Sequence, residues 1–110
     1  MNNCSSSIEG VKAWIDNSPK YDLVIDNVAA RSGWSKWHLQ RVFHEQLGVA
    51  IGEYLFNRRM KAAHDALMSG STQVEVADML GYKDQPSFQR AFKRKYGMSP
   101  KQYVKNHGPN

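Results

Sequence analysis

The stretch VAARSGW at residues 28–34 is followed, 48 residues later, by the similar stretch VADMLGY at residues 76–82. With one inserted residue, the similarity continues from LQRVF at residues 39–43 to FQRAF at residues 88–92. Each copy consists of a short apolar segment, a glycine and a longer amphipathic segment. This order is typical of a helix-turn-helix unit, in which the glycine supplies the positive φ of the tight turn. Two copies in register predict two such units in one chain.

The spacing of the apolar residues predicts an all-α fold. These residues recur at helical spacing along almost the whole chain, and no stretch alternates as a β-strand does. Glycines at positions 33, 48, 70, 81 and 97 are placed to end helices. We therefore predict seven helices, near residues 7–17, 26–32, 36–46, 51–68, 73–80, 85–95 and 100–106.

Several of these segments are preceded by residues that favour helix starts. The sequences SSIE (residues 6–9) and TQVE (residues 72–75) match the capping box, in which a hydroxyl and a later carboxylate each bind a free backbone N–H. Ser35 and Asp84 are good N-caps for the segments that follow them. Ser99 precedes a proline, which suits the first position of a helix.

The composition excludes several classes of protein. With 110 residues, of which 41% are hydrophobic, the chain fits a globular domain and not a disordered one. No stretch approaches the roughly 18 apolar residues of a membrane span, and the N-terminus has no feature of a secretory signal. The single cysteine, Cys4, lies in a polar tail and allows no internal disulfide. We therefore expect a cytoplasmic protein.

Basic residues are concentrated near the C-terminus. The chain has 15 lysines and arginines and 10 acidic residues, for a net charge of +5. Between Lys83 and Lys105 seven basic residues stand against Asp84 alone. This concentration suggests a polyanionic partner, with nucleic acid favoured over an anionic membrane, although charge alone would favour a merely solvated face.

The segment after the glycine in each unit has an apolar stripe at positions i, i+3, i+4 and i+8. We expect both stripes to face a core, because this spacing lines one side of a helix. The residues of the two stripes are Leu39, Val42, Phe43 and Leu47 in the first unit, and Phe88, Ala91, Phe92 and Tyr96 in the second.

The opposite side of each segment carries a glutamine followed by an arginine. These are Gln40 and Arg41 in the first unit, and Gln89 and Arg90 in the second. Glutamine and arginine suit bidentate contacts to adenine and guanine edges in the DNA major groove. The pattern therefore favours base reading over an ordinary solvated surface. Trp37 would pack against a thymine methyl or a sugar, or else be half-buried.

Residues 51–68 read as one continuous helix between the two units. Eighteen residues give a helix of about 27 Å, close to the ~34 Å between adjacent major grooves on one face of B-DNA. We predict a first helix-turn-helix subdomain at residues 8–50, a linker helix at 51–68 and a second subdomain at 69–106. The linker helix would then hold two reading units about one duplex turn apart.

The chain resembles the DNA-binding domain of the AraC/XylS family of bacterial transcription regulators, over about residues 8–105. The stretch GWSKWHLQRVF at residues 33–43 is similar to the first reading unit of the small multiple-antibiotic-resistance and superoxide-response activators. The pattern GYxDQxSFxRxFKxxxGxSPxxY at residues 81–103 resembles the family's signature, which is long and specific.

The resemblance implies a transcription activator that contacts duplex DNA as a monomer in two adjacent major grooves and recruits RNA polymerase. Many members also carry a ligand-sensing or dimerising domain, for which 110 residues leave no room, so we expect no small-molecule ligand. The residues expected to read bases are Trp37, Gln40 and Arg41 in one groove, and Gln85, Ser87, Gln89 and Arg90 in the other. The residues expected to contact phosphates are Ser35, Lys36, Lys83, Lys93 and Arg94.

Four positions depart from the family pattern. Pro86 removes a polar side chain from the second recognition segment, and Phe56 stands where several relatives carry an arginine that can bind phosphate. Val24 and Ala50 replace hydroxyl caps, which we expect to weaken those helix ends by about 1 kcal/mol each.

Two other functions compete with this interpretation. An enzyme is disfavoured because His38, His44, His64 and His107 are scattered and lack metal-ligand spacing, and no glycine-rich phosphate loop occurs. We therefore expect no catalytic residue, metal or cofactor. A protein-interaction module or anti-activator with the same fold would keep the apolar stripes but lose the outward glutamine–arginine pairs.

Overall fold

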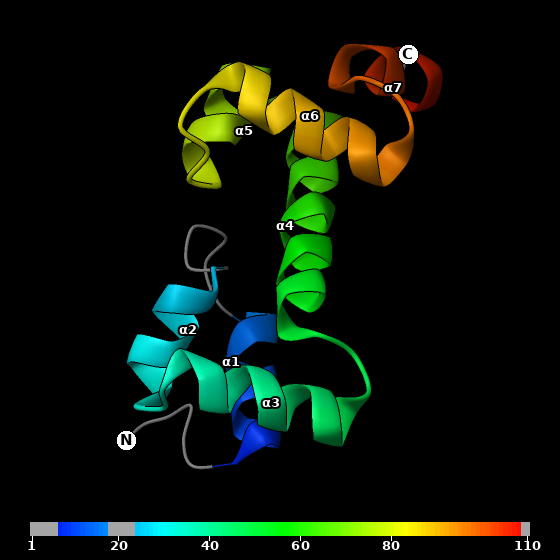
Figure 1. Cartoon of the computed structure of the whole chain (residues 1–110). Helices are drawn as coiled ribbons and strands as arrows, with labels where there is room; N and C mark the ends of the chain where they lie inside the picture. The colour runs from blue at the N-terminus through cyan, green and yellow to red at the C-terminus, as the bar shows by residue number, and fades with distance from the viewer. Residues whose placement is uncertain (1–6, 18–23, 109–110) are drawn as a thin grey trace. The chain divides into compact units, whose positions relative to one another are not determined.

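The computed structural model of the chain describes residues 7–17 and 24–108, and these residues form seven helices and no strand (Figure 1). The all-α prediction is confirmed, and every predicted helix boundary lies within one residue of the observed one. The helices are α1 (Ile8–Asn17), α2 (Ile25–Ser32), α3 (Lys36–Leu47), α4 (Ile51–Met68), α5 (Gln73–Met79), α6 (Gln85–Tyr96) and α7 (Pro100–His107).

The chain divides into two compact units, residues 1–58 and residues 59–110. The boundary lies inside α4, so this helix supplies its first eight residues to one unit and the remainder to the other. The first unit contains α1, α2 and α3, and the second contains α5, α6 and α7. That α4 is a separate linker between two subdomains stays a prediction.

The helix starts of the second unit follow the capping chemistry expected from the sequence. Thr72 Oγ1 accepts from the backbone N–H of Glu75, and Glu75 Oε1 accepts from the backbone N–H of Thr72, which completes the capping box. Asp84 caps α6 by accepting from the backbone N–H of Ser87 at 2.8 Å. Hydrogen bonds from Ser87 hold the pKa of the Asp84 carboxyl below its ordinary value. Ser99 caps α7 in the same way.

In the first unit one cap differs from the prediction. Ser7 Oγ accepts from the backbone N–H of Gly10 at 3.0 Å, so Ser7 supplies the hydroxyl at the start of α1. Ser6, which we predicted as the first residue of a capping box, lies outside the described residues. Val24 precedes α2 without a side-chain cap, as expected, and Ser35 caps α3.

Both glycine turns have the backbone geometry that the repeat predicts. Gly33 has φ of 78° and Gly81 has φ of 84°, in the left-handed region that side-chain-bearing residues rarely adopt. The turn at Gly33 joins α2 to α3 and the turn at Gly81 joins α5 to α6, and the two helices of each pair pack on each other.

Each apolar stripe faces the core of its own unit. Leu39 and Phe43 of α3 are fully buried, and so are Phe88 and Phe92 of α6. The remaining stripe residues, Val42, Leu47, Ala91 and Tyr96, are partly buried. The other side of α3 carries the exposed residues Gln40 and Arg41, and that of α6 carries the exposed residues Arg90 and Lys93.

A polar network joins α1 to the start of α4 within the first unit. The Asp16 carboxylate accepts a hydrogen bond from the Tyr54 hydroxyl and pairs with Lys12 at 3.0 Å. Arg58 Nη2 donates to the Asp16 backbone oxygen at 3.0 Å. Partial burial raises the pKa of Asp16, but the hydrogen bonds from Tyr54 and Lys12 outweigh it, so this pKa lies below its ordinary value of 3.8.

The lowered pKa of Asp16 predicts acid-sensitive stability. A carboxyl whose pKa is lower in the folded state adds stability above its unfolded pKa, and this stability is lost as the pH falls through the folded pKa. We expect Asp16→Asn to lower the melting temperature clearly at about pH 6 and much less at about pH 2. Thermal unfolding of the unsubstituted protein and of Asp16→Asn, followed at both pH values, measures the difference in melting temperature. An equal difference at both pH values would contradict the ionic role of Asp16.

Candidate nucleic-acid interface

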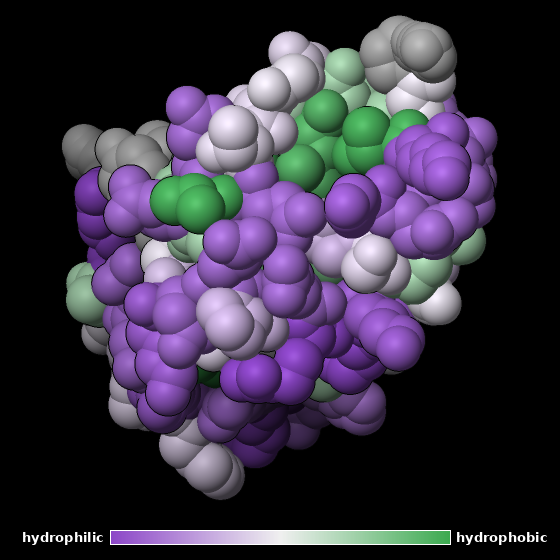
Figure 2. All heavy atoms as spheres, turned by 90° about the horizontal axis from the view of Figure 1, so that it is seen from above, coloured by the Kyte–Doolittle hydropathy of each residue, from purple (hydrophilic) through white to green (hydrophobic). Residues whose placement is uncertain are grey.

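Trp37 is the most exposed large hydrophobic residue among those described. Most of the surface seen in Figure 2 is hydrophilic, and hydrophobic residues occupy limited areas of it. The exposed large hydrophobics are Val24, Trp37, Val49 and Val74, with Trp37 at 68% exposure. The alternative of a half-buried Trp37 is therefore wrong. A single exposed tryptophan on a polar helix face is expected where a partner surface packs on it.

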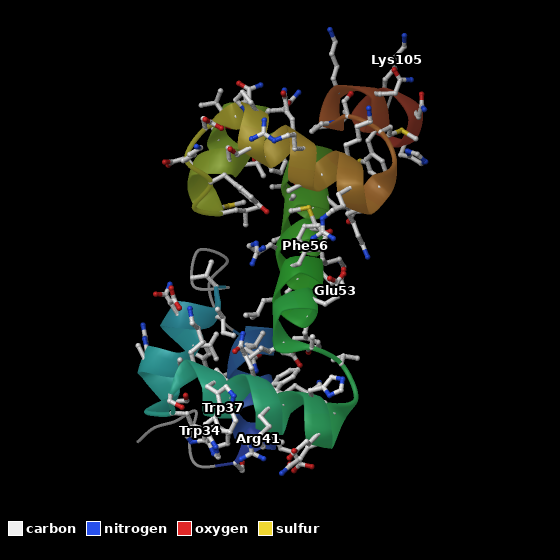
Figure 3. The ribbon with its side chains drawn as sticks, in the orientation of Figure 1. Trp34, Trp37, Arg41, Glu53, Phe56 and Lys105 are labelled. Atoms are coloured by element: carbon white, nitrogen blue, oxygen red, sulfur yellow. The ribbon has the colours of Figure 1, made fainter. Side chains whose placement is uncertain are left out.

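Trp37 and Arg41 lie one turn apart on α3 and contact each other (Figure 3). The guanidinium carbon of Arg41 is 5.1 Å from the centre of the Trp37 ring, within the range of a cation–π contact. Gln40 beside them is exposed. The structure thus brings the three residues proposed to read the first groove onto the solvent side of one helix.

Arg41 is also held by two other side chains of α3. Its Nη1 donates to both carboxylate oxygens of Glu45 at 3.2 Å, and its Nη2 lies 3.4 Å from Nδ1 of His38. The four-residue spacing of Trp37, Arg41 and Glu45 puts them on one helix face. Exposed ion pairs contribute little to stability, so this pairing leaves the guanidinium able to exchange Glu45 for another partner. Sequence reasoning missed Glu45, although its spacing from Arg41 is a signal for such a pair.

Ser35 and Lys36, proposed to contact phosphate, stand at the start of α3. Ser35 Oγ accepts from the backbone N–H of His38, which leaves its own O–H free to donate. Lys36 Nζ pairs with Asp26 of α2 at 2.9 Å, and both side chains are exposed. The N-terminus of a helix attracts anions through its free N–H groups and its dipole.

In the second unit, α6 carries the four residues proposed to read bases. Arg90 is exposed and its Nη2 donates to Ser87 Oγ at 3.3 Å. Gln85 and Gln89 are half-buried, and the Nε2 of each donates to Oε1 of Gln73. All four therefore take part in hydrogen bonds within the unit, which restricts their side chains.

Basic side chains surround α6. Lys83, Lys93 and Arg94, the residues proposed to contact phosphate here, are all exposed. Arg90 and Lys93 line a groove of about 440 Å³ together with Lys101. These three are the only ionisable residues among those that line it, so the groove favours an anion. Sequence reasoning did not place Lys101 at the site, although it belongs to the basic segment.

Gln73 also lines this groove, with Pro86, Gln89 and Ser99. The capping box predicted where α5 begins but did not mark Gln73 as a functional residue. Its contacts with Gln85 and Gln89 join residues 12 and 16 positions apart, which the local pattern could not reveal. Pro86 is exposed at the second position of α6 and, as predicted, offers no side-chain donor.

Within residues 7–17 and 24–108, no three histidine, cysteine or acidic side chains gather in a way that could hold a metal ion. None of the helices described is both long and apolar enough to cross a lipid bilayer. Cys4 lies outside the described residues.

Comparison with known families agrees with this geometry. The profile of a family described as a helix-turn-helix domain, of the AraC type, matches residues 28–106. The chain belongs to the AraC family of DNA-binding transcription regulators. This match covers both copies of the internal repeat and all the residues that we propose for the interface.

Named members of the AraC family are similar along most of this chain. The transcriptional activator AarP of Providencia stuartii is 38% identical over 90% of this chain and 74% of its own length. The regulatory protein SoxS of Escherichia coli is 37% identical over 87% of this chain and 91% of its own. These relatives are transcription regulators and not enzymes.

The fold is that of AraC-type DNA-binding domains. The DNA-binding domain of the global transcriptional factor AdpA, solved in complex with a target DNA, superposes with a TM-score of 0.76 at 25% identity. The match covers 91% of each chain. The resemblance found in the sequence is thereby confirmed for both the family and the fold.

Proposed function

We propose that this AraC-family protein is a sequence-specific transcription activator that binds two adjacent major grooves as a monomer and recruits RNA polymerase. The observation that carries the proposal is an arrangement that occurs in both units. In each unit the helix after the glycine turn buries an apolar stripe and carries a glutamine and an exposed arginine on its other side. As part of the same proposal, the protein acts at the nucleoid in the cytoplasm.

Because the chain carries two helix-turn-helix units, one copy of the protein would be enough to bind both grooves. The 18 residues of α4 correspond to about 27 Å of helix, near the ~34 Å spacing of adjacent major grooves. In this proposal Trp37, Gln40 and Arg41 of α3 read one groove. Gln85, Ser87, Gln89 and Arg90 of α6 read the other, and the basic residues beside them bind phosphate.

Footprinting on DNA fragments selected from genomic DNA tests the two-groove monomer. We expect one chain per site and two protected patches separated by about 10 base pairs, one turn of the duplex. Arg41→Ala should weaken protection of one patch, and Arg90→Ala should weaken protection of the other patch. The two arginines belong to different helix-turn-helix units. A single protected patch, or two chains per site, would overturn this binding mode.

Recruitment of RNA polymerase is tested separately by transcription in vitro. With a promoter beside the footprinted site, we expect the purified protein to increase transcript yield from purified bacterial polymerase. The AarP relative is named an activator, which favours this direction. A fall in transcript yield would show a repressor on that promoter, and no change would reject recruitment.

A further inference from the structure

Gln73 connects two of the proposed base-reading side chains of α6. Its Oε1 accepts hydrogen bonds from Gln89 Nε2 at 2.7 Å and from Gln85 Nε2 at 3.3 Å. Gln73 is the first residue of α5, and the capping box of Thr72 and Glu75 sets where α5 begins. Both hydrogen bonds therefore run from α6 to the start of α5 within the second unit.

The internal repeat indicates that the fold does not require an amide at this place. Ile25 opens α2 as Gln73 opens α5, at the 48-residue spacing of the two units. Ile25 is partly buried and packs against the core of the first unit. The first copy of the repeat thus has an apolar residue, Ile25, at this position. The second copy has Gln73, whose side-chain oxygen accepts hydrogen bonds from α6.

The acceptor on Gln73 determines the orientation of the carboxamide groups of Gln85 and Gln89. A carboxamide oxygen only accepts, so Gln73 Oε1 binds the amino ends of Gln85 and Gln89. Each of these partners keeps its own oxygen and one N–H for another ligand. Those are the two groups that bind adenine, since the oxygen accepts from N6 and the N–H donates to N7.

We infer that Gln73 is a positioning residue, which orients Gln85 and Gln89 for base reading and so sets the base preference of α6. This inference rests on the proposed function. A free glutamine loses rotamer freedom when it binds, and ordering it beforehand reduces that cost. Gln73 also shares the walls of the basic groove with Gln89, which places this ordering beside the cations that would bind the DNA backbone.

The variant Gln73→Met tests the inference, because it removes the acceptor and keeps the length of the side chain. Affinity is measured for a bound site, for every single-base change in it and for random duplex DNA, together with the melting temperature. In Gln73→Met we expect the loss of affinity caused by a base change opposite α6 to become about twofold to tenfold smaller. This factor corresponds to the net free energy of one hydrogen bond. Penalties opposite α3 and affinity for random DNA should stay unchanged, and the melting temperature of the protein should fall only slightly, because both lost hydrogen bonds involve half-buried side chains.

Two further variants separate positioning from a structural role. Gln73→Glu keeps an acceptor oxygen, so it should preserve the base preference while its negative charge weakens binding to all DNA alike. Gln102→Met makes the same chemical change at an exposed amide of α7, which donates to Asn106, and should change none of these measurements.

Unchanged penalties opposite α6 in Gln73→Met would overturn the inference. An equal loss of affinity for specific and random DNA with a lower melting temperature would also overturn it, because Gln73 would then be structural. If the unsubstituted protein shows no sequence preference on duplex DNA, the proposed function fails as well. That failure is distinguishable because it is seen before any residue is changed.

Discussion

A fourfold rise in salt concentration should weaken binding to duplex DNA by at least about 150-fold, because cation–phosphate contacts release counterions from DNA. Four of the residues proposed to contact phosphate are charged, namely Lys36, Lys83, Lys93 and Arg94. At about −0.9 per contact, they predict a slope near −3.6 for the logarithm of affinity against the logarithm of salt concentration. The slope becomes steeper if other residues of the basic segment, such as Lys101, also bind phosphate.

A salt titration of affinity on one duplex, from about 50 to about 200 mM, measures this slope. Lys93→Ala should make the slope shallower by about 1, because one phosphate contact is lost. Lys61→Ala is the matched control, since Lys61 is an exposed lysine of α4 that pairs with Asp65 at 3.0 Å. A slope near zero in the unsubstituted protein would reject duplex DNA as its main partner.

Arg41→Ala should reduce affinity for the specific site by about 5-fold to 150-fold, corresponding to 1–3 kcal/mol for one bidentate base contact. Arg41 is exposed on α3, and its guanidinium contacts the Trp37 ring and the Glu45 carboxylate. We expect the preference for one base pair to disappear with it. Affinity for random DNA should fall much less, because base contacts carry the sequence information.

Three comparisons isolate base reading by Arg41. Lys93→Ala should weaken specific and random DNA about equally, because a phosphate contact does not depend on sequence. Arg41→Lys keeps the charge and should retain the salt slope, but it should lose the base preference because an ammonium group lacks the bidentate geometry. Gln46→Ala, at an exposed position of the same helix, should change neither quantity. If Arg41→Ala and Lys93→Ala shift specific and random DNA alike, α3 does not read bases.

Local chemistry in the sequence determined the helices of this protein. Hydroxyl and carboxyl groups at Thr72, Asp84 and Ser99 satisfy backbone N–H groups only three residues away. The positive φ of Gly33 and Gly81 likewise depends on a single residue. Interactions of such short range are visible in the sequence, which is why each predicted boundary lies within one residue of the observed one.

The internal repeat and the helical spacing also determined which sides of α3 and α6 face solvent. Because Leu39 and Phe43 are buried, Gln40 and Arg41 point to solvent, and on α6 the same argument holds for Arg90. The family followed from the signature at residues 81–103, which the family match at residues 28–106 contains. The roles of the individual side chains on DNA remain predictions.

Only the tertiary structure decided how side chains from different helices meet. Asp16 binds Tyr54, 38 residues away in the sequence, and Gln73 binds Gln89, 16 residues away. These contacts depend on how α1 packs on the start of α4 and how α5 packs on α6, and helical spacing says nothing about the partner of a polar residue. The physical reason is that helix periodicity specifies which face is buried, whereas the pairing of polar groups depends on the exact rotation and offset of two packed helices.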